Sequence, residues 1–255
     1  MIIIKTDSEI ARLRKGGPIL ARILQQVAHA VKPGVTTKTL DGIAYALIAE
    51  AGCTPAFLNY KPDGADRPYP ASLITSINSE VVHGIPGTTI LKEGDIIALD
   101  LGLKHDGVFL DHAITVPVGT IAAKDKQLLS ITKSALDEGI AAIKPGATVG
   151  DIGHAIESFV KPYKLGIVRG LSGHGVGREI HEDPYVPNYG KKGKGDKLKP
   201  GMVIAIEPML TRGAEEVIQM KDGYTLKTID GSRSAHFEHT VLIKEDGYPE
   251  ILTIF

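Results

Sequence analysis

The chain has 255 residues, of which 43% are hydrophobic, and its formal net charge is −1. This length and apolar content allow a sizeable buried core, while the balanced charge excludes a global basic field that would steer the protein to nucleic acid or an acidic membrane. A single cysteine, Cys53, excludes an internal disulfide framework, and no apolar run approaches membrane-spanning length. We therefore expect a globular protein of the reducing cytoplasm.

Helical spacing of apolar residues predicts two helix pairs, one in each half of the chain. The first helix begins at Thr6 or Asp7 and is interrupted by Gly16-Gly17-Pro18. The second runs over about residues 36–52. The helices of the second half are expected at about residues 124–143 and 148–160.

A polar segment follows the first helix pair. Residues 61–68 are rich in Pro and contain Gly, which is typical of an exposed loop. The next segment, SLITSINSEVVHGIP, has the pattern of an extended hairpin and contains His83 near its end. A lone histidine is usually structural, so any function of His83 has to be judged from its neighbours.

The stretch IIALDLGLKHDGVFLDHAITV, residues 96–116, predicts two buried antiparallel strands joined at Asp106-Gly107. Each strand carries one aspartate, Asp100 or Asp111, and the turn sets the two opposite one another or one step out of register. Two carboxylates on buried strands repel each other and lose hydration. They persist only if one is protonated or a cation lies between them.

The second half of the chain repeats these acidic strands. LKEGDIIALD, which ends at Asp100, matches LKPGMVIAIE, which ends at Glu207. LDHAITV matches FEHTVLI and sets Glu238 against Asp111. Each acidic residue of the first half thus has an acidic counterpart in the second.

A third echo supports a duplicated architecture, because IKPGATVGDIGHAI resembles VKPGVTTKTLDGIA. We expect an α+β fold formed by one domain of residues 1–255, in which pseudo-halves of about 1–120 and 121–255 close on each other. Four carboxylates then converge where the halves meet.

Glycines surround His174 in the segment GLSGHGVGREIHEDP, residues 170–184, which also contains His181. Glycine lets the backbone approach a ligand closely, so we expect His174 to face a site. The pattern is neither a Walker loop nor GxGxxG after a strand, which disfavours a phosphate cradle.

Four carboxylates and one imidazole form the candidate metal-binding set: Asp100, Asp111, His174, Glu207 and Glu238. Oxygen-rich sites with a single nitrogen suit Mn, Fe(II), Co or Zn, and five side chains are more than one catalytic ion normally uses. Two divalent ions about 3.5–4 Å apart that share carboxylates explain the count. Such a pair lowers the pKa of a shared water and polarises a carbonyl, so the set predicts hydrolytic chemistry.

These motifs resemble those of the bacterial type I methionine aminopeptidases, from the first helix to the last strand. The shared segments are VVHGIP, the Asp100/Asp111 hairpin, GHGVGREIHEDP, IAIEPM around Glu207 and SAHFEHTV around Glu238. The resemblance implies the pita-bread fold, in which two pseudosymmetric halves of helices on a curved antiparallel sheet surround a dinuclear metal centre. In that centre Asp100 would bind one ion, His174 and Glu207 the other, and Asp111 and Glu238 would bridge both.

The resemblance also implies catalytic roles and a substrate. A bridging hydroxide would attack the first peptide carbonyl, and N-terminal methionine would be released from nascent proteins and peptides. His83 and His181 would contact the substrate, while Glu207 would pass the proton to the leaving amine. The family is also expected to act as a monomer.

A methionine pocket is implied at six positions: Phe57, Tyr60, Tyr69, Ile74, Ile180 and Tyr224. The sequence departs from the family pattern here, since Phe57 stands where a cysteine is common and Gly102 where a threonine is common. The loop of residues 61–68 is extra length between two pocket tyrosines. The pocket positions nevertheless remain apolar or aromatic and suit a thioether.

Two alternative functions are weighed against this one. X-Pro aminopeptidases and prolidases share the ligand set but typically carry an additional N-terminal domain, for which this chain has no room. A non-catalytic peptide-binding relative would usually have lost ligands, whereas all five are present. Type II methionine aminopeptidases carry a helical insertion between the last histidine motif and the next glutamate ligand. In this chain only residues 181–207 lie there, which favours type I.

Three features outside the main set complete the analysis. The lysine-rich run at residues 191–199 either touches the ribosome surface or forms a solvated loop, and lysines interleaved with glycines favour the loop. His112 and His239 follow the two bridging residues and are expected to pack behind or support them. His236 is assigned no role.

Overall fold

Two helix pairs each precede a group of strands, as the sequence predicts. The helices are α1 Asp7–His29, α2 Thr37–Glu50, α3 Ala123–Ala141 and α4 Val149–Val160, and a 3-10 turn, Lys161–Tyr163, follows α4. The computed structural model describes residues 1–62 and 64–255. Within these residues, none of the helices combines the length and the apolar character needed to cross a membrane.

In the described part of the chain, the strands form one nine-stranded antiparallel sheet and two three-stranded sheets. The large sheet has the order β1-β4-β5-β14-β9-β7-β8, with β2 on β4 and β15 on β14. Its strands are β1 Thr54–Pro55, β2 Ile74–Ile77, β4 Ile96–His105, β5 Val108–Pro117, β7 Gly173–Gly175, β8 Glu182–Val186, β9 Val203–Ile206, β14 Glu238–Ile243 and β15 Pro249–Ile251. The small sheets contain β6 Gly166–Ile167, β10 Met209–Thr211 and β13 Ser234–His236, and β3 Glu80–Val82, β11 Val217–Gln219 and β12 Leu226–Thr228.

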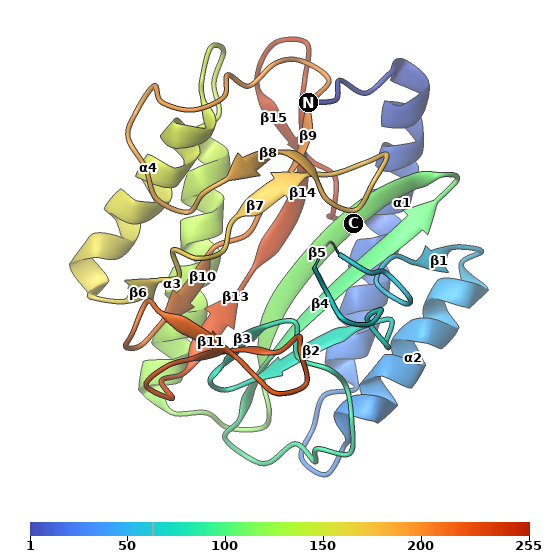
Figure 1. The fold of residues 1–255 in the computed structure, drawn as a ribbon, viewed down its shortest axis with the longest axis vertical. Coiled ribbons are helices and arrows are strands. Elements are labelled where there is room, and N and C mark those ends of the chain that lie inside the picture. The colour runs from blue at the N-terminus through green and yellow to red at the C-terminus, as the bar shows by residue number, and fades with distance from the viewer. Residues whose placement is uncertain (63) are drawn as a thin grey trace.

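The centre of the large sheet consists of one strand pair from each half of the chain. β4 pairs with β5 along its whole length, and β14 pairs with β9. The two pairs join where Ala113 and His112 of β5 face Glu238 and His239 of β14. Figure 1 shows green β5 beside red β14, so the predicted meeting of two related halves is confirmed.

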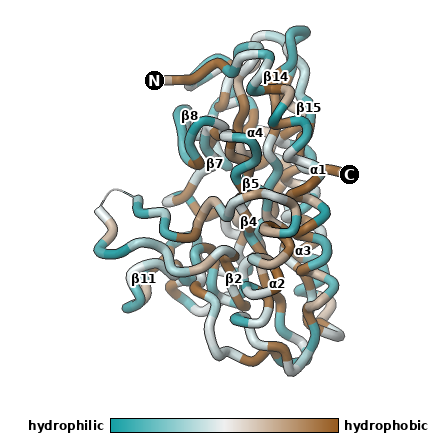
Figure 2. The backbone as a smooth tube through the Cα atoms, turned by 90° about the vertical axis from the view of Figure 1, so that its right-hand side faces the viewer, coloured by the Kyte–Doolittle hydropathy of each residue, from teal (hydrophilic) through white to brown (hydrophobic). Residues whose placement is uncertain are grey.

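Each helix pair covers its own hydrophobic cluster against this sheet. Leu13 of α1 and Leu40 of α2 pack with residues of β4 and β5. Leu128 of α3 and Ile156 of α4 pack with residues of β9 and β14. Figure 2 places α1 and α3 on one side of the sheet and β11 on the other. The helices therefore hold one face of the sheet and leave the other for loops and small sheets.

The register of the aspartate hairpin differs from the prediction. Asp100 faces Ala113 and Asp111 faces Gly102, so the aspartates are diagonal neighbours two positions out of register. The cause is the turn at Asp106-Gly107, which holds two residues with positive φ and fixes the pairing. Because side chains alternate with a period of two, both aspartates still project from the same face.

The predicted hairpin before His83 forms only in part: the chain reverses at Asn78-Ser79 and the Thr75 amide donates to the Gly84 carbonyl oxygen at 2.9 Å, but its two strands belong to different sheets. β2 pairs with β4 of the large sheet, whereas β3 pairs with β12 of a small sheet. Asn78 lies between them with a φ of 57°, bonds to Asp95 and accepts a bond from the Ser234 backbone, which directs the chain from one sheet to the other. His83, with a φ of 61°, then follows β3.

The predicted interruption of the first helix is wrong as well, because α1 continues through Pro18. A Cβ at Gly16 would lie 2.6 Å from Leu110 Cδ1, and one at Gly17 would lie 2.0 Å from the carbonyl oxygen of Leu252. These glycines thus serve close approach between the helix and the sheet, and tertiary packing overrides their helix-breaking tendency.

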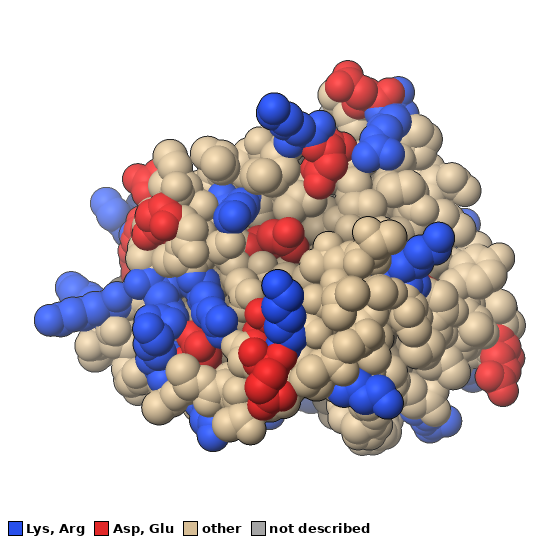
Figure 3. All heavy atoms as spheres, turned by 90° about the horizontal axis from the view of Figure 1, so that it is seen from below, with Lys and Arg blue, Asp and Glu red and all other residues tan. Residues whose placement is uncertain are grey.

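The two predicted loops are exposed. In residues 61–68, Lys61, Gly64 and Arg67 are exposed, while Asp63 lies outside the described residues. In residues 191–199 all side chains are exposed except Leu198, which is buried. Figure 3 shows basic and acidic side chains interspersed on one face of the molecule, in keeping with the net charge of −1.

We predict that Gly17→Ala destabilises the protein by about 1–3 kcal/mol, because the added methyl group would overlap the Leu252 backbone. Urea unfolding followed by circular dichroism measures this loss. Gly42→Ala in α2 is the matched control, since a Cβ there meets no heavy atom within 4 Å. Its helix propensity should add up to about 1 kcal/mol of stability. Equal effects of the two variants would contradict the packing argument.

Candidate metal centre

The five predicted ligands lie on five adjacent strands of the large sheet. In the sheet order β4, β5, β14, β9 and β7, the residues are Asp100, Asp111, Glu238, Glu207 directly after β9, and His174. Every one of them is at most 9% exposed. The strands of the sheet therefore place the five predicted ligands, which come from both halves of the chain, in one buried region.

The side chains of this set approach one another closely. Ligand atoms of Asp111, His174 and Glu238 all lie within 4.8 Å of one another. His174 Nε2 is 3.5 Å from Glu207 Oε1 and 4.0 Å from Asp111 Oδ2. Asp100 belongs to the same cluster, because it interacts with the carboxylates of Asp111 and Glu207. The structure thus brings all five predicted residues together.

Crowding of buried carboxylates shifts their protonation. Burial, opposed by His236 and reinforced by the charge of Glu207, raises the pKa of Asp100 to about 7. Burial also raises the pKa values of Asp111 and Glu238 well above their usual range, and the neighbouring carboxylates raise them further. The cluster therefore needs protons or a cation to compensate its negative charge.

The donor set fits a divalent metal ion. Asp100 Oδ1 and Glu238 Oε1 are buried and have no hydrogen-bond partner among the described residues. A buried acceptor without a partner is costly, and a cation would supply the missing partner. Carboxylate oxygens combined with one imidazole nitrogen are the ligands that Mn, Fe, Co and Zn accept.

Neutral residues behind the ligands escaped the sequence analysis. Thr240 Oγ1 donates to the Asp111 carbonyl oxygen at 2.7 Å and accepts from the Asp111 amide at 3.0 Å. Asn188 Nδ2 donates to the Glu207 carbonyl oxygen at 3.0 Å. Buried Thr and Asn give no local signal in a sequence, since their value here comes from partners far away along the chain.

His236, to which the sequence analysis assigns no role, contacts a predicted ligand. Its Nε2 lies 3.3 Å from Glu207 Oε2. Burial alone would lower the pKa of His236, but the hydrogen bond and charge of Glu207, together with Asp100, raise it overall. The position of His236 two residues before Glu238 in SAHFEHTV was the one available signal.

His112 and His239, which directly follow Asp111 and Glu238, pack against each other. Their rings stack with centroids 4.8 Å apart and an interplanar angle of 12°. His112 Nδ1 donates to the Glu238 carbonyl oxygen, and His239 Nδ1 bonds with Thr253 Oγ1. Burial lowers the pKa values of both histidines, so the stack is neutral at pH 7.

His181 lies at the edge of the metal cluster. Its ring centroid is 4.5 Å from that of His174, with the rings edge to face, and its Nδ1 bonds with the Tyr60 hydroxyl at 3.0 Å. The residue is exposed on one side, yet burial of the ring against the site and the charges of His174 and His83 lower its pKa.

His83 borders the same cluster from a different sheet. Burial lowers the pKa of His83; Glu207 opposes this shift, whereas His236 and His174 add to it. A neutral imidazole can donate a hydrogen bond with one nitrogen and accept one with the other. His83 and His181 can therefore serve either purpose toward a ligand at the site.

The six predicted pocket residues belong to one hydrophobic cluster, in which Tyr60 is partly buried and the other five are buried. The Tyr69 and Tyr224 rings meet edge to face with centroids 5.2 Å apart. The Tyr69 hydroxyl donates to the carbonyl oxygen of Gly84, the residue directly after His83, at 2.8 Å. The structure thus brings these side chains together beside the two site histidines.

Two departures from the family pattern compensate each other. A Cβ at Gly102 would lie 2.9 Å from Ala56 Cβ and 3.0 Å from Phe57 Cε1. A ring at Phe57 therefore needs glycine opposite it. The described end of the extra loop packs beside the pocket, because the Tyr224 hydroxyl donates to the Arg67 carbonyl oxygen and Arg67 Nη2 donates to that of Asp222.

Comparison with known proteins agrees with this geometry. The profile of Metallopeptidase family M24 matches residues 11–245. Methionine aminopeptidase 1 of Bacillus subtilis is 44% identical over 253 residues, which cover 99% of each chain. The methionine aminopeptidase of Aquifex aeolicus is 47% identical over 251 residues, which cover 97% of each chain.

Solved structures extend the similarity to the fold. The crystal structure of methionine aminopeptidase from Thermotoga maritima is 41% identical and superposes over 100% of both chains with a TM-score of 0.95. The prolidase from Pyrococcus furiosus is 26% identical, with a TM-score of 0.76, and the match covers 66% of its chain. The pita-bread fold is thereby confirmed. From the profile match and these full-length relatives, the chain belongs to Metallopeptidase family M24.

Proposed function

We propose that the protein is a methionyl aminopeptidase, a metal-dependent hydrolase that removes the N-terminal methionine from peptides and nascent proteins. The observation that carries this proposal is the buried convergence of four carboxylates and His174 in a chain similar over its full length to methionine aminopeptidases. We also propose that residues 1–255 act as one catalytic domain, as a monomer, in the cytoplasm.

Two divalent ions, of Co, Mn, Fe or Zn, are proposed to bind the five residues Asp100, Asp111, His174, Glu207 and Glu238. Their number follows from the size of the donor set, and the bridging role of Asp111 and Glu238 from the resemblance. When bound, such ions polarise a peptide carbonyl and make water more acidic. The raised carboxylate pKa values support this assignment, because they record negative charge that a cation would compensate.

The remaining chemistry is assigned to the chain's own side chains. We propose that His83 and His181 bind the substrate backbone around the first peptide bond as neutral donors. Glu207 would carry the proton to the leaving amine. Its two carboxylate oxygens lie 3.5 Å from His174 and 3.3 Å from His236, which supports a held and oriented carboxylate.

We propose that the methionine side chain enters the apolar pocket next to these histidines. Its proposed lining is Phe57, Tyr60, Tyr69, Ile74, Ile180 and Tyr224. Burial of a flexible thioether among aromatic and aliphatic side chains favours methionine over charged or small residues. Arg67 holds the described part of the extra loop against Tyr224, so this loop would bound the pocket on one side. No ribosome contact is needed for this activity.

We predict that the metal-free protein releases no methionine from a Met-Ala-Ser peptide and that Mn(II) or Co(II) restores release. Chromatographic detection of free methionine measures this. The loaded enzyme should favour this peptide over an Ala-Pro-Ala peptide by about 100-fold in kcat/KM, since the apolar pocket fills only with methionine. Preference for the X-Pro peptide would contradict the proposal and indicate an X-Pro aminopeptidase or prolidase. Inactivity with every metal would indicate a non-catalytic peptide-binding relative.

We predict that Glu238→Gln lowers metal affinity by at least about tenfold, as measured by calorimetry, because one crowded carboxylate is lost. Without metal the variant should melt at a higher temperature than the parent, since buried repulsion is relieved. Glu245→Gln, at an exposed position after the same strand, is the control and should change neither quantity. Unchanged affinity in Glu238→Gln would exclude Glu238 as a ligand.

We predict that His181→Ala lowers kcat/KM by about 100-fold while metal affinity stays within twofold, because the imidazole contacts substrate and not the ions. Steady-state kinetics and calorimetry measure the two quantities. His154→Ala on α4, whose imidazole bonds with the Ser158 hydroxyl of the same helix, is the matched histidine control and should behave like the parent. A large loss of metal affinity in His181→Ala would place His181 among the ligands instead.

A further inference from the structure

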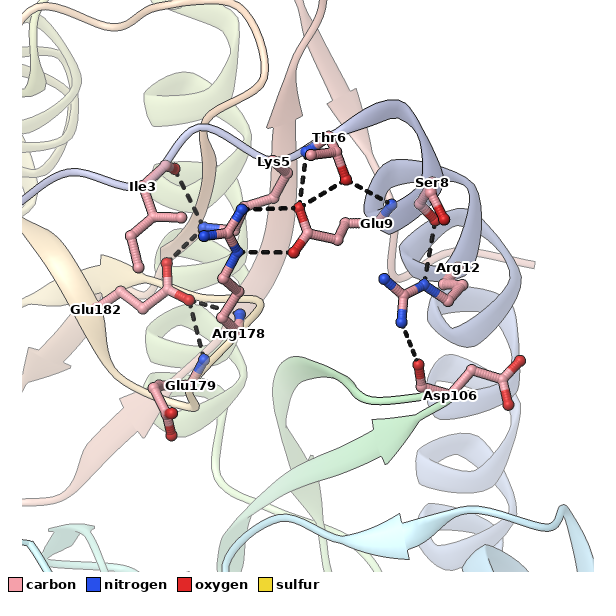
Figure 4. Close-up of polar contacts among 10 residues, drawn as sticks. All are labelled: Ile3, Lys5, Thr6, Ser8, Glu9, Arg12, Asp106, Arg178, Glu179 and Glu182. Atoms are coloured by element: carbon pink, nitrogen blue, oxygen red, sulfur yellow. Dashed lines mark hydrogen bonds and ion pairs between the residues drawn. The ribbon is translucent and has the colours of Figure 1, made fainter.

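A buried ion pair links the N-terminal segment to the turn that carries His181. Lys5 Nζ lies 2.5 Å from Glu182 Oε2, and the two side chains are 1% and 3% exposed. Lys5 Nζ also donates to the Ile3 carbonyl oxygen at 3.3 Å. Figure 4 shows Glu182 opposite the N-terminal segment, with its carboxylate directed at the Lys5 ammonium group.

The second oxygen of the same carboxylate closes the turn before His181. Glu182 Oε1 accepts from the Arg178 amide at 2.5 Å and from the Glu179 amide at 2.9 Å. Glu182 is adjacent to His181 in the chain and begins β8. One carboxylate thus fixes the backbone on both sides of Ile180 and His181, and Lys5 is its charged partner.

The backbone is shaped to admit the lysine. A Cβ at Gly177 would lie 2.3 Å from Lys5 Cε, and Gly177 adopts a φ of 143°. The Gly177 carbonyl oxygen accepts from the Phe109 amide of β5 at 2.7 Å. The lysine stem therefore packs against the start of the turn, where the turn meets the strand that carries Asp111.

A second tie between the same segments is more exposed to solvent. Arg178 donates to both carboxylate oxygens of Glu9 at 2.7 and 3.2 Å, and Glu9 also closes the capping box of α1 with Thr6 (Figure 4). Because Arg178 is 48% exposed, solvent screens this pair more than it screens the buried pair of Lys5 and Glu182. Loss of one partner of the buried pair is far more damaging, since it leaves an uncompensated charge.

We propose that Lys5, through Glu182, is a positioning residue that holds the His181 ring at the metal centre. The ring's place is defined by contacts with His174 at 4.5 Å and Tyr60 at 5.3 Å, both on other strands or loops. A turn released from Lys5 would carry His181 away from these contacts. This inference rests on the proposed role of His181 in substrate binding.

A double-mutant cycle between Lys5 and His181 tests the proposal. Lys5→Met should lower kcat/KM on Met-Ala-Ser about tenfold, mainly through kcat, because small displacements of a catalytic group are costly. In the His181→Ala background the same substitution should cost less than about twofold, since residues that act as a unit are not additive. Equal losses in both backgrounds, or no loss in either, overturn the proposal.

One further variant separates positioning from folding. Lys5→Met/Glu182→Gln leaves no charge buried alone and retains an acceptor for the two turn amides, so its melting temperature should return close to that of the parent. Its kcat/KM should stay reduced; full recovery of both would mean that the pair acts through stability alone. This double variant also replaces Lys5→Met in the cycle if the single variant does not fold.

The control is Arg14→Gln, which removes the exposed pair between α1 and Glu250 and should leave kcat/KM within twofold in both backgrounds. The outcomes also distinguish failure of the proposed substrate-binding role of His181 from failure of the proposed positioning role of Lys5. If His181→Ala alone leaves kcat/KM unchanged, the role of His181 fails. If His181→Ala is damaging and Lys5→Met costs as much with His181 as without it, only the positioning role of Lys5 fails.

Discussion

Repulsion among buried carboxylates is the constraint on which the rest of the structure depends. Asp100, Asp111, Glu207 and Glu238 lie in a region where water cannot screen them, and burial with mutual charge raises the pKa values of the first two and the last. No arrangement of the chain's own cations resolves this, since among the described residues only histidines contact the cluster. The scaffold therefore holds together a set that is complete only with bound cations.

Duplication explains how one sheet gathers that set. Each half supplies a strand pair with an acidic residue on each arm, and β5 joins β14 at the centre. The two pairs are not identical in register, since Ala113 faces Asp100 whereas its counterpart Thr240 faces Ala205. The shift is two residues, so the side chains keep their face. At this position the Thr240 hydroxyl bonds with the amide and the carbonyl oxygen of Asp111, and these bonds link one half to the other.

The sequence predicted the helix pairs and the acidic residues and histidine that converge at the candidate site, because both depend on local patterns that recur in the chain. The sequence-based predictions failed where contacts between residues far apart in the chain determine the local structure. Gly16-Gly17-Pro18 reads as a break, but the glycines meet Leu110 and Leu252; the segment around Asn78 reads as a hairpin, but its partners belong to two sheets. His236 was assigned no role and Asn188 was missed for the same reason, because only the folded chain sets them against Glu207.

The stacked rings of His112 and His239 lie directly beside the two residues proposed to bridge the ions. Each ring follows its carboxylate by one position, and His112 also bonds the backbone of Glu238. The two rings thus pack face to face at the join of β5 and β14, where His112 pairs with His239. An ion of different radius would have to be accommodated by rotation of the carboxylates, because the strands that bear them cannot separate without parting the rings.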